Sequence, residues 1–399
     1  MLTRRLFLKA GGVTLFALGA GPQFLTRTAL AAQGRRKVLV TIFQRGAMDG
    51  LMAVTPLSED LRALRPRLAM GAKELLGLGV DFGLHPAFEP LLPLWKEKRL
   101  GIVHAVGSPD STRSHFDAQD YMETGTPGRK GTPSGWLNRA VGLLGHERGE
   151  GSPFRAVSLT PALPRSLYGD EPALAVADLA DFRAPAAGQS FEALYAQTSQ
   201  KVLHDTADDT FQAMAMLTPE KVARYRPANG AEYPITPLGQ ALRQIALLIK
   251  SDVGLEVAFA ESGGWDTHVQ QGTVNGSFAR QARDLAQSIH AFWTDLGPAH
   301  QDGVLLSTMT EFGRTVRENG SGGTDHGHGS CLFVLGNQVQ GGRVHGSFPG
   351  LDALYEGRDL PVTTDFRAVF CELAGGHLGI KDDARLFPGW AGKRLPLLL

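Results

Sequence analysis

The chain has 399 residues and carries 40 basic and 40 acidic side chains, which give a formal net charge of zero. Neutrality argues against a nucleic-acid-binding protein, because such proteins carry a basic surplus. Hydrophobic residues make up 43% and charged residues 20%, which excludes a disordered protein and allows a large core that needs neither disulfides nor metal to fold.

The first 31 residues have the pattern of a twin-arginine export signal. Arg4 and Arg5 precede a glycine-diluted apolar stretch over 10–25, and Ala29-Leu30-Ala31 has the small residues of a cleavage site. The pattern predicts transient binding to the twin-arginine translocase, export to the periplasm and a mature protein beginning near Ala32. The alternative is a retained membrane anchor. The stretch is too short and glycine-rich to cross about 30 Å of hydrocarbon, and no later segment is long enough, so we expect no stable membrane span.

Cleavage would change the charge balance. The first 31 residues hold four basic side chains and no acidic one, so the mature protein would carry a net charge of −4. An anionic substrate would then need local positive charge, because the overall field of the protein would not attract it.

Six apolar segments predict buried strands in the mature chain, and helical patterns separate them. The strands are expected at 37–43, 102–106, 156–159, 255–260, 303–310 and 331–335. One helix should begin at Thr236-Pro237, a second should run from Ser277 to Gly297, and a helical zone covers about 191–217. Strands alternating with helices predict an α/β fold with a mostly parallel central sheet. We expect one domain over 32–399 with a helical insertion around 161–235.

Polar residues gather after several of these strands, at the edge where open α/β sheets bind ligands. Asp49 follows the first strand, as a metal ligand or as the cap of a following helix. Ser114 and His115 follow the second strand and precede a helix, so that Ser114 could act as a nucleophile activated by a metal or a base. Asp266 and His268, two residues apart after the fourth strand, are typical of half a metal site, or else belong to a surface turn.

The densest polar segment follows the fifth strand. Asp325, His326 and His328 offer one oxygen and two imidazole ligands, and the surrounding glycines let the backbone come close. Arg314 could hold an anionic group of the substrate by a bidentate contact. The alternative is a flexible glycine-rich loop, which explains the glycines but not the clustering of an aspartate with two histidines.

Several enzyme classes lack their motifs in this chain. There is no G-x-S-x-G elbow, no P-loop and no H-E-x-x-H helix. The two cysteines, Cys331 and Cys371, are too few for a zinc ribbon or a disulfide framework, and they could pair or stay free.

Four motifs together with the export signal resemble one bacterial family. They are Arg45-Gly46-Ala47-Met48-Asp49-Gly50-Leu51, Ser114-His115-Phe116-Asp117-Ala118-Gln119, Gly264-Trp265-Asp266-Thr267-His268, and Glu311-Phe312-Gly313-Arg314 with Gly323-Thr324-Asp325-His326-Gly327-His328. The family consists of exported proteins of unknown function and is distantly similar to the alkaline phosphatase and sulfatase superfamily. The resemblance covers essentially the whole mature chain.

The resemblance implies a three-layer α/β/α fold and an active site that often holds two divalent metals. It implies that Asp49 is the acidic residue after the first strand and that Ser114 is the nucleophile before a helix ending in Glu123-Thr124-Gly125. Two departures stand out: Glu311, rather than an Asp-His pair, closes the fifth strand, and no cysteine precedes the Thr-Gly helix. Glu311 would then take the place of a metal-binding aspartate, and a formylglycine sulfatase is not expected.

We therefore expect an exported, metal-dependent hydrolase of a small anionic ester, with phosphate favoured over sulfate and sulfate left open. Ser114, His115 and Arg314 would be catalytic. The ligands of the divalent ion or ions, whether zinc, manganese, calcium or magnesium, would come from Asp49, Asp266, His268, Glu311, Asp325, His326 and His328. One alternative is a non-catalytic exported binding or assembly protein on the same fold, and another is a metal-dependent oxidoreductase, since the twin-arginine route often carries redox proteins.

Overall fold

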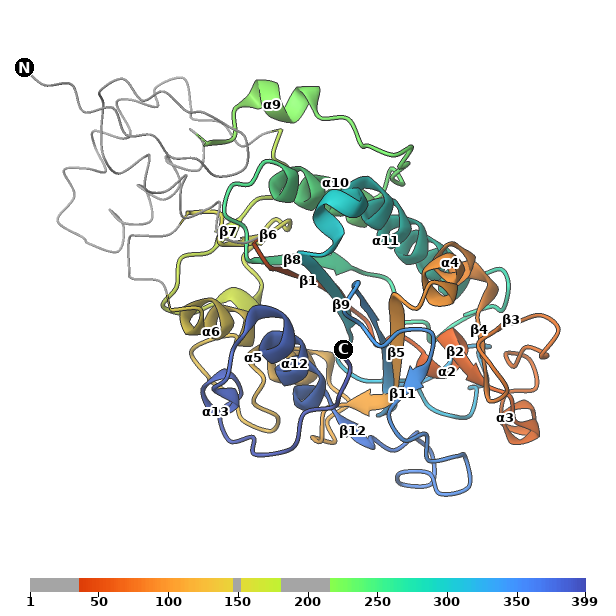
Figure 1. Cartoon of the computed structure of the whole chain (residues 1–399). Helices are drawn as coiled ribbons and strands as arrows, with labels where there is room; N and C mark the ends of the chain where they lie inside the picture. The colour runs from red at the N-terminus through yellow and green to blue at the C-terminus, as the bar shows by residue number, and fades with distance from the viewer. Residues whose placement is uncertain (1–35, 146–151, 181–215) are drawn as a thin grey trace, which may run out of the picture. The chain divides into compact units, whose positions relative to one another are not determined.

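A twisted sheet with helices on both faces forms the centre of the unit Lys37–Leu399 (Figure 1). The computed structural model describes residues 36–145, 152–180 and 216–399. The export signal and residues 191–215 of the expected helical zone lie outside these ranges. Within them we find no helix with the length and apolarity needed to span a bilayer.

The sheet is built around β1, which lies between two parallel neighbours. β1 (Val38–Gln44) pairs with β8 (Val257–Ser262) on one side and β9 (Val304–Met309) on the other. The strand order is β11-β5-β10-β9-β1-β8-β6-β7, and β12 also pairs with β5. The remaining strands are β5 (Leu100–Gly107), β6 (Ala156–Ser158), β7 (Leu174–Ala175), β10 (Ser330–Leu335), β11 (Val344–His345) and β12 (Thr364–Asp365).

The sequence prediction of an α/β fold with a mostly parallel sheet is confirmed. Each of the six expected segments overlaps a strand of the sheet, namely β1, β5, β6, β8, β9 and β10. β10 is the exception to the parallel direction, because it runs antiparallel to both β9 and β5. A small separate sheet joins β2 (Val54–Pro56), β4 (Phe82–Leu84) and β3 (Leu76–Gly77).

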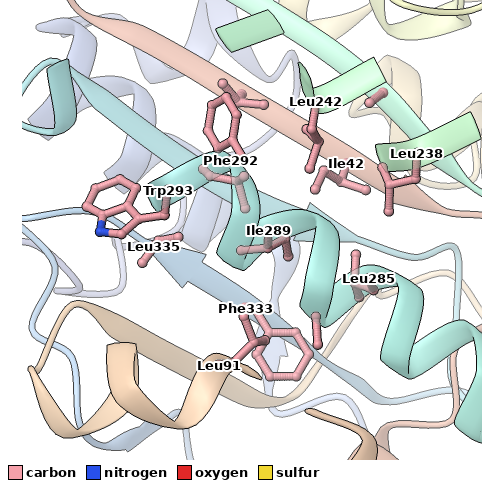
Figure 2. Close-up of a cluster of buried hydrophobic side chains, with 14 of the residues drawn as sticks. Ile42, Leu91, Leu238, Leu242, Leu285, Ile289, Phe292, Trp293, Phe333 and Leu335 are labelled. Atoms are coloured by element: carbon pink, nitrogen blue, oxygen red, sulfur yellow. The ribbon is translucent and has the colours of Figure 1, made fainter. Parts of the chain in front are cut away.

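Two helical layers cover the two faces of the large sheet. On one face α10 (Pro237–Lys250) and α11 (Ser277–Gln301) pack against β1, and Figure 2 shows Ile42 of β1 beneath Leu242 of α10 and Phe292 of α11. The opposite face is covered by α6 (Trp136–Leu143) and α12 (Phe366–Leu373), whose apolar side chains share a cluster with Leu39 and Phe43. The alternation of β1 side chains between the two clusters follows from the two-residue period of a strand.

The helix boundaries follow local signals. Thr236 caps α10 with its side chain, as expected, and Gly297 takes a positive φ of 57° that interrupts α11. Gly276 rather than Ser277 is the N-cap of α11. The shorter helices are α2 (Gly50–Ala53), α3 (Glu59–Leu64), η1 (Pro86–Leu91), α4 (Leu92–Lys96), α5 (His115–Thr124), η2 (Arg165–Leu167), α9 (Pro219–Arg224), η3 (Ala374–Leu378) and α13 (Asp383–Leu386).

The described parts of the expected insertion do not form a purely helical unit. β7 lies within residues 161–180 and extends the edge of the main sheet beyond β6, whereas α9 lies in residues 216–235. Cys331 and Cys371 are both buried and free, so they do not pair.

Three buried histidines are held as neutral rings by hydrogen bonds at both ring nitrogens. His104 accepts a hydrogen bond at Nδ1 from the Ala105 amide (2.8 Å) and donates from Nε2 to the Val54 carbonyl (2.9 Å). In His85 and His377, Nε2 also donates to a backbone carbonyl 3.0 Å away, while Nδ1 accepts from the Ala87 amide in His85 and from the Gln338 side chain in His377. Burial lowers the pKa of all three to about 4, because a charged ring would lose its hydration.

We expect the stability of the protein to fall as the pH drops below about 6.5. The unfolded chain takes up protons on these histidines first, so each costs roughly 1.4 kcal/mol per pH unit between its unfolded pKa of about 6.5 and its folded pKa. Denaturant unfolding at pH 7 and pH 5 should show a smaller loss, by about 2 kcal/mol, in His377→Gln than in the natural protein. His290→Gln, on the half-buried side of α11, is the control, and equal pH dependence in His377→Gln and the natural protein would contradict the argument.

Candidate functional site

Four strands end at one edge of the sheet, and the loops that follow them meet there. In β1, Gln44 lies opposite Ser262 of β8, and Phe43 lies opposite Met309 of β9, so these three carboxyl ends are level. β5 runs in the same direction as β9, because both are antiparallel to β10. The loops after β1, β5, β8 and β9 therefore bring the expected site residues to a common edge.

The connection from β9 to β10 starts and ends at this edge, because the two strands are antiparallel neighbours. Within it, residues 313–315 pair with 325–328, through Gly313 N to His328 O (2.7 Å) and Thr315 N to Asp325 O (2.9 Å). Gly327 is required in this pairing, since a Cβ there would lie 2.3 Å from the carbonyl carbon of Arg314. The glycines thus allow the close backbone approach that the sequence predicted.

Three imidazole rings converge on one carboxylate oxygen of Asp266. From Asp266 Oδ1, the Nε2 atom lies 3.1 Å away in His268, 3.2 Å in His326 and 3.6 Å in His115. The Nε2 atoms of His268 and His326 are 2.9 Å apart. His115, Asp266 and His326 offer ligand atoms that all lie within 4.8 Å of one another. We call these four residues the histidine–aspartate centre.

Each ring of the histidine–aspartate centre is oriented through its other nitrogen. Nδ1 of His115 lies 2.8 Å from Glu311 Oε1, Nδ1 of His268 lies 3.0 Å from Asp325 Oδ1, and Nδ1 of His326 lies 2.8 Å from the Arg113 carbonyl. All three partners are acceptors, so Nδ1 donates in each ring, and in the neutral ring Nε2 then presents its lone pair to the centre. This tautomer is the reverse of the one that His85, His104 and His377 adopt.

The arrangement of lone pairs fits a divalent cation. The Nε2 atoms of His268 and His326 are 2.9 Å apart, so either a shared proton or a cation separates their lone pairs. Ligands about 2.0–2.2 Å from a tetrahedral ion are separated by about 3.4 Å, which is close to the 3.1–3.6 Å between Asp266 Oδ1 and the three Nε2 atoms. Three imidazoles and one carboxylate suit zinc and other transition metals, and acceptors on the outer nitrogens are the usual support of ligating histidines.

Arg314 is buried, and five hydrogen bonds hold its guanidinium. It donates to the carbonyl oxygens of Gly46, Ala47, Trp265 and Thr324 and to Asp266 Oδ1 at 2.5 Å. Burial alone would raise the pKa of Asp266, but the hydrogen bond and charge of Arg314 outweigh it and lower that pKa. The structure therefore places Arg314 as a support of Asp266 and of three loops, and not where it could bind a substrate group.

Glu311 supports His115 and has no free oxygen for a metal. Its Oε1 accepts from His115 Nδ1, Gly46 N and Gln119 Nε2 at 2.8–2.9 Å, and Oε2 accepts from Thr310. Although the carboxylate is fully buried, which opposes ionisation, these donors lower its pKa. The hydrogen bond to Glu311 in turn raises the pKa of His115, and burial lowers that of His326.

Two other expected ligands lie away from the histidine–aspartate centre. Asp49 is buried, caps α2 at Met52 N and forms an ion pair with Arg65 (2.8 Å), and Gln271 donates to it at 2.7 Å. This is the helix-cap alternative that the sequence left open. His328 directs Nε2 to the Ser108 carbonyl (2.9 Å), whereas Nε2 of His326 lies beside Asp266.

Ser114 is the N-cap of α5 and directly precedes His115. Its side chain is exposed and makes no capping hydrogen bond, so the hydroxyl is available to a ligand. Asp325 is exposed and acts on the centre through His268.

Sequence reasoning assigned no role to some residues that shape the centre. Phe312 packs its ring 5.0 Å from the rings of both His115 and His326, and the Arg113 carbonyl orients His326. Arg65 could not have been paired with Asp49 from the sequence, because the contact depends on tertiary structure. Gln119 and Arg45, in contrast, stand in motifs that the sequence singled out.

Comparison with solved structures finds distant overlaps. A sulfatase from Pseudoalteromonas sp., PsFucS1, is 11% identical, covers 81% of this chain and 67% of its own, and has a TM-score of 0.36. The C-terminal periplasmic domain of EptC from Escherichia coli, in complex with Zn, is 10% identical over 91% and 89% of the two chains, with a TM-score of 0.40. The lipoteichoic acid synthase LtaP from Listeria monocytogenes is 9% identical over 87% and 73%, with a TM-score of 0.35.

Overlaps this loose carry no argument about chemistry, which depends on the residues of this chain. Among curated proteins nothing matches. A family model described as "Protein of unknown function (DUF1501)" matches residues 71–388, which is well over half of the chain. The chain therefore belongs to the DUF1501 family.

Proposed function

We propose that this protein is an exported, metal-dependent hydrolase of phosphate or sulfate esters. The observation that carries the proposal is the convergence of three imidazole Nε2 atoms on Asp266 Oδ1. Export rests on the signal pattern of residues 1–31, which implies the twin-arginine translocase as a transient partner and the periplasm as the location.

His115, Asp266, His268 and His326 would hold a divalent ion. The chemistry that such an ion supplies is Lewis acidity, which lowers the pKa of a hydroxyl or water and offsets negative charge on an ester. Arg314 already compensates the charge of Asp266, so a bound dication would keep most of its positive charge for an anionic substrate. This local positive charge would attract an anionic substrate, which the net negative charge of the mature chain would not do.

Ser114 is the proposed nucleophile. Its hydroxyl is exposed at the N-terminus of α5, where the helix dipole favours negative charge, and it adjoins His115. Attack by Ser114 Oγ on the phosphorus would break the bond to the alcohol oxygen, and the hydroxyl proton would end on the departing alcohol. Water would then hydrolyse the phosphoserine and restore the hydroxyl with release of phosphate.

Separate alanine substitutions of two histidines in the same loop test the metal centre. Purified mature protein should contain a stoichiometric divalent ion by elemental analysis, and His326→Ala should lose it because one of the converging ligands is gone. His328→Ala is a matched control, since its ring faces the Ser108 carbonyl, and it should keep the metal. Circular dichroism checks that both variants are folded. Equal metal content in the two variants, or none in the natural protein, would refute this centre.

The nucleophile is tested on p-nitrophenyl phosphate and p-nitrophenyl sulfate. Ser114→Ala should lower kcat/KM by about 1000-fold or more while the metal content stays unchanged, because only the attacking oxygen is removed. Ser111→Ala, on another exposed serine of the same loop, should leave the rate within about twofold of the natural protein.

Other outcomes separate the alternatives. Full activity in Ser114→Ala would assign the attack to water in place of the serine. Metal binding without turnover of a broad panel of phosphate and sulfate esters would favour the non-catalytic binding or assembly protein, and an absorbing redox cofactor would favour the oxidoreductase.

A further inference from the structure

Arg45 is held by hydrogen bonds and ion pairs to three side chains. Its Nε and Nη2 donate to Glu261 at 2.8 and 2.6 Å, Nη2 also contacts Glu123 at 2.9 Å, and Nη1 donates to Gln119 Oε1 at 2.9 Å. Glu261 lies near the carboxyl end of β8, whereas Glu123 and Gln119 lie on α5. Arg45 therefore ties the helix that carries His115 to the end of β8, the strand before Asp266 and His268.

Gln119 can adopt only one amide orientation between its neighbours. An arginine only donates, so the Gln119 oxygen must face Arg45, and an ionised Glu311 only accepts, so the Gln119 nitrogen must face Glu311. The Gln119 Nε2 to Glu311 Oε1 distance is 2.9 Å. The direction of the amide is thus dictated from both sides.

Glu311 connects Gln119 to the ring of His115. The Oε1 atom that accepts from Gln119 also accepts from His115 Nδ1 at 2.8 Å. A carboxylate fixed by several donors cannot rotate away, so the His115 ring keeps its tautomer and its direction.

We propose that Gln119, held by Arg45 and acting through Glu311, is a positioning residue that sets the affinity of His115 for the metal. The inference deepens the proposed function, since it requires that the histidine–aspartate centre binds a cation. Residues that orient metal-ligating histidines typically change metal affinity 10–100-fold when they are altered. The effect on metal affinity should therefore exceed any effect on the fold.

The test compares two substitutions of adjacent residues on α5 in the mature protein. Gln119→Met keeps the length of the side chain but removes both hydrogen bonds of its amide. Asp120→Asn is the matched control, because Asp120 pairs with Arg165 (2.9 Å) and not with Glu311. The dissociation constant for Zn²⁺, measured by competition with a chelating dye, should rise about 10–100-fold in Gln119→Met and stay within about twofold in Asp120→Asn.

A second measurement needs no metal. In metal-free natural protein, proton NMR should show a slowly exchanging Nδ1–H of His115, assigned by its absence in His115→Gln, because this proton is held by Glu311. The resonance should broaden or vanish in Gln119→Met and persist in Asp120→Asn. Thermal unfolding of the metal-free variants should show similar melting temperatures, which separates positioning from a loss of fold.

The outcomes distinguish this inference from the proposed function. An unchanged Zn²⁺ affinity in Gln119→Met, in a natural protein that binds Zn²⁺, would overturn the positioning role, and so would an unchanged His115 resonance. If the natural protein binds no metal, the proposed function fails, and with it the claim about affinity, whereas the NMR result still decides whether Gln119 orients His115.

Discussion

The buried guanidinium of Arg314 is the interaction on which the site depends. Its nitrogens reach carbonyl oxygens in the loops after β1, β8 and β9, and its one charged partner is Asp266. A charge removed from water is stable only when it is paired and hydrogen-bonded, so the three loops must come together around it. The position of Asp266 at the focus of three histidines is then a consequence of how this one charge is satisfied. The residue that the sequence suggested for holding substrate instead holds the loops.

Much of the fold was predictable because its signals are local. β-branched apolar runs mark β1, β8 and β9, and a threonine followed by proline marks the start of α10. The location of the site at the carboxyl ends of the strands follows from chain direction, and Asp266, His268 and His326 meet there as their clustering indicated. The roles of individual residues were less predictable, since a role depends on partners far away in the sequence. Asp49 looks like a ligand until Arg65 is found against it, and His115, expected to act on the substrate, lies with its Nε2 atom beside the other rings. The antiparallel direction of β10 also had no sequence signal, because buried parallel and antiparallel strands have similar compositions.

The same residue type serves two purposes in this molecule, and the direction of its hydrogen bonds separates them. In His104 the backbone amide of Ala105 occupies Nδ1, and Nε2 must donate, which leaves no lone pair for a metal. In His268 a carboxylate accepts a hydrogen bond from Nδ1–H, so Nε2 of the neutral ring keeps its lone pair. An acceptor at Nε2 therefore marks the structural histidines, while an acceptor at Nδ1 marks the histidines that can bind a cation. The choice between these partners depends on tertiary contacts, which explains why composition and spacing alone do not distinguish the two groups.

The β9–β10 connection contributes residues to the site but is almost unnecessary for the sheet. Adjacent antiparallel strands can be joined by a turn of two residues, so the sheet itself needs almost none of residues 310–329. A parallel strand in the place of β10 would have forced the chain to cross back to the opposite edge, usually through a helix, and would have carried His326 away from Asp266. Because β10 is antiparallel, the chain contains a long segment whose sequence is not needed to form the sheet. Variation in that segment can change ligands, charge or shape at the centre while the strand order beneath stays intact.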